Sequence, residues 1–208
     1  MGKTKIILAI ACLALGALRG PCAAEELELV SGDRFVLDLR YNTADNFLKT
    51  NVYGKFGLDK CYVRPEMAAR LKQLAELLGE RKLKLLIYDC YRPLDVQRAM
   101  WKLVPDPKFV ADPKKGSNHN RGVAIDAALA GEDGRALVFP TQFDDFTSRA
   151  FHSYTCPAAA PEPCANREIL RTLMLKAGLK PLSSEWWHYE LPGAKKYPLI
   201  ERFHAKSK

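Results

Sequence analysis

The sequence predicts a single domain that mixes α-helices with β-strands, and two kinds of hydrophobic spacing support this prediction. Apolar residues recur at intervals of three or four in residues 65–78 and 166–177, which is typical of amphipathic helices with one buried face. Apolar or aromatic runs of strand length occur at residues 83–89, 123–129 and 185–191. A chain of 208 residues is long enough to bury a core of its own.

The first 24 residues are expected to be a secretory signal and to lie outside this domain. Two lysines precede an apolar run at residues 6–17, and small residues then lead to Ala24, where we expect cleavage. The run is too short to span a membrane, which predicts a protein exported to the periplasm without stable membrane insertion, with residues 25–208 as its one domain. A buried N-terminal helix is the alternative. Lipid attachment at Cys22 is another, although the residues before it are a poor lead-in.

The charge balance is modestly basic. The chain has 32 Lys and Arg residues against 24 Asp and Glu residues, and three of the basic residues but none of the acidic ones lie in residues 1–24. Residues 25–208 therefore carry a formal charge of +5, which favours anionic surroundings such as cell-envelope polymers. The sequence has no stripe of Lys and Arg interleaved with aromatic residues, so nucleic acid is not an expected partner.

Four cysteines remain in residues 25–208, and an even number suits the oxidising compartment of an exported protein. Cys156 and Cys164 bracket a proline-rich loop that a bridge would hold, so we pair them and leave Cys61 with Cys90 by elimination. Four cysteines allow other pairings as well, and the sequence does not choose among them. A cysteine zinc site is the rival interpretation, but none of the spacings is Cys-x-x-Cys.

The first half of the domain is expected to combine short strands with two helices. In chain order the predicted elements are an edge strand or two in residues 27–40, a loop at 41–51, a helix at 65–78, a strand at 83–89, a helix at 95–101 and a loop at 102–115. Pro65 opens the first helix, because proline is well tolerated at a first helical position, and Gly79 is expected to end it.

The second half is expected to contain a hairpin, a helix and a last strand. In chain order the predicted elements are strands at residues 123–129 and 136–139, a helix at 166–177 and a strand or strand-turn at 185–191. The glycine- and aspartate-containing turn at residues 131–134 predicts the hairpin, and Gly178 is expected to end the helix.

His119 and Asp126 are candidate metal ligands. They lie seven residues apart, an odd spacing that in a flat strand points two side chains to opposite faces. Gly122 removes this objection because it can supply a turn, which puts His119 on a loop and Asp126 on the following strand. Hydrolytic zinc sites usually take three protein ligands and leave a fourth position for water, so His188 would complete the set with one zinc ion per chain.

Glu185 is the candidate base of this site. It precedes His188 by three residues, which predicts that both lie on one side of a helical turn or on a tight irregular segment. A lone histidine is more often a surface or hydrogen-bonded residue than a ligand. Two of the four histidines nevertheless fall in segments that also hold an acidic residue. A set of two histidines and one carboxylate also suits iron, and the neighbouring glutamate favours zinc.

Two motifs carry a family resemblance. Ser117-x-His119-x-x-Gly122-x-Ala124-x-Asp126 and the later Glu-Trp-Trp-His at 185–188 resemble the signature of the D-alanyl-D-alanine dipeptidases, the VanX-like branch of the zinc D,D-peptidases. Nearly all of residues 25–208 are covered, because further matching stretches lie at residues 38–47, 89–93, 142–144 and 166–167.

The resemblance implies an α+β fold of the Hedgehog/D,D-peptidase type, in which a small antiparallel sheet carries the zinc site and helices pack against it. The predicted strands and helices are compatible with this fold and do not select it on their own. The loop at residues 102–115 is shorter than in the longest members of the family, which puts specificity for dipeptides alone in doubt.

The resemblance also assigns roles to five further residues. Glu185 is implied as the base, and Arg92 as the group that stabilises the oxyanion. Tyr41 is implied to lie in the substrate pocket, Asp144 to bind the free ammonium of the substrate, and Ser117 to hydrogen-bond its backbone or carboxylate end. Simpler interpretations exist: Tyr41 in a surface connector, Arg92 in a salt bridge, and Asp144 as a helix cap or turn residue.

The expected function is zinc-dependent hydrolysis of D-alanyl-D-alanine to two D-alanine molecules, in cell-wall turnover or in metabolism of the glycopeptide-resistance type. One alternative is a peptidoglycan D,D- or L,D-carboxypeptidase of the same superfamily, which would not need a receptor for a free amine. The other alternative is a non-catalytic, zinc-stabilised binding module. The presence of both Glu185 and Arg92 argues against it.

Overall fold

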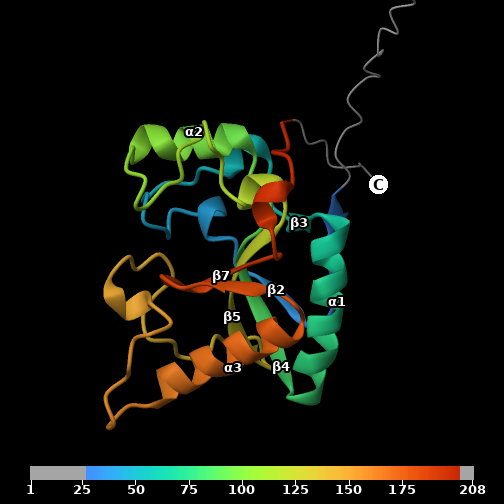
Figure 1. Ribbon diagram of the computed structural model, residues 1–208, viewed down its shortest axis with the longest axis vertical. Helices are drawn as coiled ribbons and strands as arrows, with labels where there is room; N and C mark the ends of the chain where they lie inside the picture. Colours follow the sequence, from blue (N-terminus) through green and yellow to red (C-terminus); the bar gives the residue numbers. More distant parts are fainter. Residues whose placement is uncertain (1–26, 202–208) are drawn as a thin grey trace, which may run out of the picture.

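The computed structural model describes residues 27–201, and within that range its centre is a five-stranded sheet (Figure 1). In spatial order the strands are β2 (Phe35–Leu37), β4 (Leu83–Asp89), β5 (Ala124–Gly131), β7 (Glu185–Glu190) and β6 (Lys180–Leu182). All neighbouring pairs are antiparallel except β2 and β4, which are parallel, so the predicted antiparallel sheet carries one parallel edge strand. The predicted signal at residues 1–24 lies outside the described residues.

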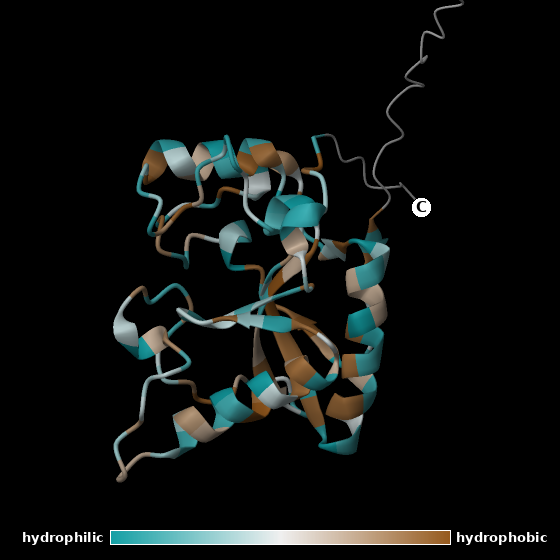
Figure 2. Cartoon of the chain, viewed as in Figure 1, coloured by the Kyte–Doolittle hydropathy of each residue, from teal (hydrophilic) through white to brown (hydrophobic). Residues whose placement is uncertain are grey.

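Two helices cover the sheet. Helices α1 (Pro65–Glu80) and α3 (Glu162–Lys176) form one hydrophobic cluster with β4 and β5, and the central strands are correspondingly apolar in Figure 2. The inward residues of the two helices are those that the helical spacing predicts: Met67, Leu71, Leu74 and Leu78 from α1, and Leu170, Leu173 and Met174 from α3. The mixed α+β fold is thus confirmed.

Helix α2 (Leu94–Leu103) lies apart from the other two, at the upper end of the molecule in Figure 1. It packs on the loops that follow β2 and forms a second hydrophobic cluster, made of Tyr41, Val52, Tyr53, Leu58, Val96, Met100 and Val110. The short strands β1 (Glu28–Leu29) and β3 (Tyr62–Val63) pair with each other outside the main sheet. The two clusters leave room for a cavity between them, described below.

Two predicted helix ends and one predicted strand are wrong. Helix α1 passes through Gly79 and ends one residue later, and the left-handed backbone that follows it is at Lys82, with φ 55°. Helix α3 begins at Glu162, before the predicted start at residue 166, because Pro163 is tolerated in a first helical turn. Residues 136–139 form no named strand, and only the isolated bridge between Ala130 and Ala136 remains of the predicted hairpin.

Two disulfides lie within the described residues. Cys61 is bonded to Cys90, with 5.5 Å between their Cα atoms, and Cys156 is bonded to Cys164, with 5.8 Å. Both cysteines of the first pair are buried, and this bridge joins the start of β3 to the end of β4. The second bridge closes the loop before α3 onto that helix. None of the helices in residues 27–201 is both long and apolar enough to cross a membrane.

Candidate metal centre and substrate cavity

His119, Asp126 and His188 converge at one end of the sheet. Asp126 lies on β5 and His188 directly opposite it on β7, while His119 lies in the 3₁₀ helix η3 (His119–Arg121) that precedes β5. All three side chains are buried, and each offers a ligand atom within 4.8 Å of the other two. This is the constellation that the two sequence motifs predict.

The predicted turn between His119 and Asp126 is present at Gly122. Its φ of 68° is in the left-handed region, where glycine is much less strained than other residues. A Cβ atom at this position would also lie 3.0 Å from Leu27 Cδ2 and 3.3 Å from Arg64 Cγ. The glycine therefore allows η3 to end abruptly and β5 to begin two residues later.

Hydrogen bonds orient both imidazole rings toward Asp126. His119 Nδ1 lies 2.8 Å from the Cys90 carbonyl oxygen, to which it donates, so His119 Nε2 faces Asp126 Oδ2 at 3.3 Å. His188 Nε2 lies 3.2 Å from Glu190 Oε2, while His188 Nδ1 lies 2.9 Å from Asp126 Oδ1. Metal-binding histidines commonly hold their outer ring nitrogen in this way, so the donor set fits a divalent metal ion.

The electrostatics of the cluster favour a bound cation. Burial opposes the charged form of Asp126, but His119 and His188 outweigh it and hold the pKa of this carboxyl well below its usual range. Burial likewise opposes the charged form of His188, yet hydrogen bonds to Asp126 and Glu190 raise its pKa to about 10. Positive charge is thus stabilised among these three side chains even though they are buried.

Glu185 lines the same cavity as the three candidate ligands. It is the first residue of β7, so the expectation of a helical turn from Glu185 to His188 is wrong. An undistorted strand would point residues three apart to opposite faces. The pairing of β6 with β7 is irregular here, because Pro181 pairs with Tyr189 but Leu182 pairs with Glu185. Burial raises the pKa of Glu185 above its ordinary value.

Arg92 also lines the cavity. In the sequence it lies between β4, which ends at Asp89, and α2. Its Nε lies 3.1 Å from Asp89 Oδ2 and its Nη1 lies 3.0 Å from Gln97 Oε1, and Nη2 donates to Asp89 as well. Arg92 therefore forms the salt bridge of the simpler interpretation and also lies in the pocket, as the resemblance implies. These contacts fix the guanidinium group at the cavity wall.

Asp144 and Tyr41 form a second polar point in the cavity. The Tyr41 hydroxyl donates to Asp144 Oδ2 at 3.0 Å, and both side chains line the cavity. Asp144 has φ 60°, which marks a turn, and none of the helices in residues 27–201 begins at it. Burial, followed by the nearby charge of Asp126, raises the pKa of Asp144 well above its usual range. Ser117 lies on the same cavity, with its Oγ 3.3 Å from the His119 amide nitrogen.

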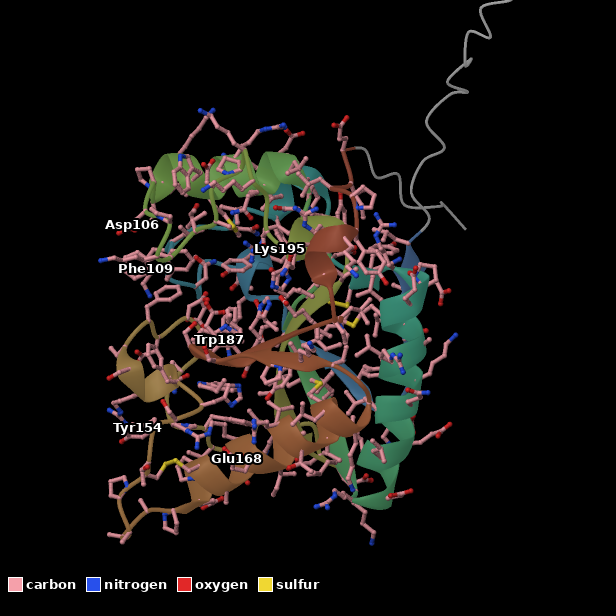
Figure 3. The ribbon with its side chains drawn as sticks, viewed as in Figure 1. Asp106, Phe109, Tyr154, Glu168, Trp187 and Lys195 are labelled. Carbon is pink, nitrogen blue, oxygen red and sulfur yellow. A yellow bond between two sulfur atoms is a disulfide. The ribbon has the colours of Figure 1, made fainter. Side chains whose placement is uncertain are left out.

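The cavity has a volume of about 490 Å³, which is ample for a dipeptide. Its wall combines the polar residues above with Phe109, Trp187 and Lys195, which lie around the same part of the molecule in Figure 3. Trp187 lines the cavity, whereas Trp186 stacks on Phe139 with 4.1 Å between ring centroids. Trp187 thus walls the pocket, and Trp186 packs in the core.

Further polar residues of the site have no role predicted from the sequence. Asp89 and Gln97 hold Arg92, Glu190 contacts His188, and Lys195 lies at the cavity wall. Asp89 and Glu190 could have been found, since one begins a quoted motif and the other lies two residues after His188 on a predicted strand. Nothing in the pattern indicates Lys195, because its position depends on how the chain folds back after β7.

Three known proteins of the same name are similar to this chain. The chain is 37% identical over 164 residues to a D-alanyl-D-alanine dipeptidase of Escherichia coli (strain K12), which covers 79% of this chain and 82% of the relative. It is 30% identical over 183 residues to a D-alanyl-D-alanine dipeptidase of Enterococcus faecium, covering 79% and 88% of the two chains. The Streptomyces coelicolor enzyme of the same name is 29% identical over 185 residues, with the same coverage.

A protein-family model also matches most of the chain. The Peptidase_M15 model, described as D-ala-D-ala dipeptidase, matches residues 26–207, a span that contains every candidate site residue. With this match and the relatives above, the chain belongs to the Peptidase_M15 family of D-ala-D-ala dipeptidases.

Proposed function

We propose that this protein is an exported zinc dipeptidase that hydrolyses D-alanyl-D-alanine to two D-alanine molecules. The observation that carries the proposal is the buried group of His119, Asp126 and His188, with Glu185 in the same cavity. The three relatives reported above, all called D-alanyl-D-alanine dipeptidase, support the choice of substrate.

Zinc is the metal that we propose for this site. His119 Nε2, His188 Nδ1 and a carboxylate oxygen of Asp126 would hold it, and three such ligands with a carboxylate base beside them are typical of zinc hydrolases. Bound zinc supplies Lewis-acid chemistry: it polarises the scissile carbonyl and makes water acidic enough to attack near neutral pH.

The chain's own residues divide the remaining work. Glu185 takes the proton of the attacking water and returns it to the leaving amine, a role that suits a carboxyl whose pKa burial has raised. Arg92, fixed by Asp89 and Gln97, presents its guanidinium group to the oxyanion that forms. A rigid cation costs little reorganisation as charge develops, and no covalent intermediate is needed.

Asp144 is the residue that we propose as the receptor for the free amine of the substrate. A bound ammonium group would give the buried Asp144 carboxyl a partner of opposite charge, which offsets its raised pKa and favours the carboxylate, and the Tyr41 hydroxyl donates to the same group. Ser117 lies beside His119 and is proposed to hydrogen-bond the backbone or carboxylate end of the substrate. A receptor for the free amine distinguishes a dipeptidase from a carboxypeptidase, which acts on longer chains.

We also propose that residues 1–24 direct the protein to the periplasm. The charged start, the apolar run and the small residues before Ala24 support export. Two disulfides in the folded part support an oxidising compartment.

The test is hydrolysis of D-alanyl-D-alanine by residues 25–208, measured with and without a chelator. L-alanyl-L-alanine, N-acetyl-D-alanyl-D-alanine and a stem pentapeptide serve as comparison substrates. Chelator-sensitive cleavage of the free D,D-dipeptide alone is the expected result. Faster cleavage of the acetylated dipeptide or of the pentapeptide would reject the dipeptidase in favour of a carboxypeptidase.

A further inference from the structure

Glu190 contacts both chain segments that carry the histidines of the cluster. Its Oε2 atom accepts hydrogen bonds from His188 Nε2 at 3.2 Å and from Asn118 Nδ2 at 2.6 Å. Asn118 directly precedes His119 and is the N-cap residue of η3. One carboxylate oxygen therefore links the last strand of the site to the loop that holds the other histidine.

The backbone places Glu190 where it can make both contacts. On β7 it lies two residues after His188, so the two side chains project to the same face of the strand. It pairs with Ala124 at the start of β5, only six residues after Asn118 in the sequence. The side chain is half-buried and lines the cavity, so it is held between strand and loop and is not free in solvent.

Glu190 is not positioned as a fourth ligand. Its Oε2 approaches His188 through Nε2, whereas Asp126 approaches the same ring through Nδ1. The two ring nitrogens point away from each other, so Glu190 lies on the outer side of the imidazole. From there it can keep a proton on Nε2, so that Nδ1, which faces Asp126 and His119, is the nitrogen that gives up its proton when a metal ion binds.

We propose that Glu190 is a positioning residue for the metal site, which fixes the tautomer of His188 and clamps the His119 loop against β7. The proposal rests on the metal-ligand set given under Proposed function. Losing such a partner of a ligating histidine weakens metal binding by about 10- to 100-fold in other proteins, and Glu190 additionally restrains a second ligand-bearing segment through Asn118.

The experiment measures the zinc dissociation constant by competition with a chromophoric chelator, with no substrate present. Glu190→Ala is expected to weaken binding by about 10- to 100-fold. Glu190→Gln keeps an oxygen that can accept both hydrogen bonds, so a loss below about 10-fold is expected for it. Glu168→Ala is the matched control, because Glu168 pairs with Arg167 and Arg171 on α3, and it should bind zinc like the wild type.

A second readout reports the tautomer directly. In the zinc-loaded wild type, the nitrogen chemical shifts of His188 should show a protonated Nε2 and a metal-bound Nδ1, and Glu190→Gln should keep this pattern. Unchanged zinc affinity in Glu190→Ala would overturn the proposal. Should Glu190→Ala not fold, Asn118→Ala carries the test, and wild-type zinc affinity in that variant would overturn the proposal equally. A wild type that binds no zinc would instead refute the proposed ligand set.

Discussion

Asp126 and His188 are directly opposed residues of β5 and β7, and Asp126 Oδ1 lies 2.9 Å from His188 Nδ1. On the other side of β5, Asp126 pairs with Asp89 of β4. Asp89, whose carboxyl holds Arg92, thus forms one row with Asp126 and His188 across three neighbouring strands. A slip of one residue in either pairing would turn one of these side chains to the opposite face of the sheet. The register of the sheet, together with the irregularity between Ile87 and Asp89 that places Asp89 opposite Asp126, therefore builds the site.

Replacement of Glu185 by glutamine should abolish most of the activity while leaving the metal in place. Glutamine has nearly the same size but cannot accept the proton of water, and general acid–base catalysis contributes about 10²- to 10⁴-fold. Because Glu185 is outside the group of three ligand atoms, zinc affinity should not change. Steady-state kinetics and zinc titration of Glu185→Gln, beside Glu168→Gln, check this. Wild-type turnover in Glu185→Gln would show that another group acts as the base.

Replacement of Asp144 by asparagine should weaken recognition of the free amine. Asparagine tolerates the left-handed backbone of this position, so the variant removes the charge and keeps the turn. A charge-assisted hydrogen bond is worth about 1.5–3 kcal/mol, which corresponds to a loss in kcat/KM of roughly 10- to 150-fold, mainly through KM.

The control for Asp144 is its neighbour. Asp145 caps a turn by accepting from the Thr147 amide and is not among the residues of the main cavity. Asp145→Asn should therefore keep the wild-type KM for D-alanyl-D-alanine. If Asp144→Asn lost no more than Asp145→Asn, the ammonium would have to bind elsewhere.

Much of this architecture could be predicted from the sequence, because the information was local. The strand at 83–89 and the inward face of α1 follow from hydrophobic spacing alone. Gly122 indicated the turn that brings His119 back to Asp126, and the structure has that turn. These are features that a few consecutive residues determine.

The wrong predictions concern segments whose structure is determined by contacts with distant parts of the chain. Phe139 stacks on Trp186, so residues after the bridge at Ala136 pack against β7 and do not extend the ladder with β5. Glu185 and His188 line one cavity although they lie three apart on a strand, where the pairing with β6 is irregular; the spacing alone did not decide between a helical turn and such an irregular segment. The position of Lys195 similarly requires the folded chain.

The two disulfides should differ in their contribution to stability and to the site. Closure of the 29-residue separation between Cys61 and Cys90 should stabilise the fold by about 3–4 kcal/mol, and the 8-residue separation between Cys156 and Cys164 by about 2–3 kcal/mol. The Cys90 carbonyl also orients His119. Replacing the first pair by alanine should therefore weaken zinc binding as well, whereas replacing the second pair should not.

Urea unfolding and zinc titration of the two double variants check this prediction. The second pair is the matched control, because its replacement also removes one bridge, but that bridge joins the loop before α3 to the first turn of the helix and does not line the cavity. Equal zinc affinity in both variants would show that the backbone at Cys90 holds its place without the bridge.

His152 should make the protein less stable in mild acid. Its ring nitrogens are buried, and within the described residues neither has a hydrogen-bond partner. Burial, with the nearby charges of Arg167 and Arg171, lowers the pKa of His152 to about 4. Below pH 6.5 the unfolded chain takes up a proton that the folded chain refuses, so stability should fall as the pH drops from about 6.5 to 4.

The variant His152→Phe isolates this effect, because it fills a similar space and does not titrate. With chelator present in both proteins, the free energy of unfolding of the wild type should fall relative to that of the variant by about 1–2 kcal/mol between pH 7 and pH 4, after allowance for solvent screening of a half-buried ring. Contributions of the other carboxyl and imidazole groups cancel in the difference. Urea unfolding across this pH range measures it, and parallel curves for the two proteins would mean that His152 is protonated in the folded state, with a partner for its charge.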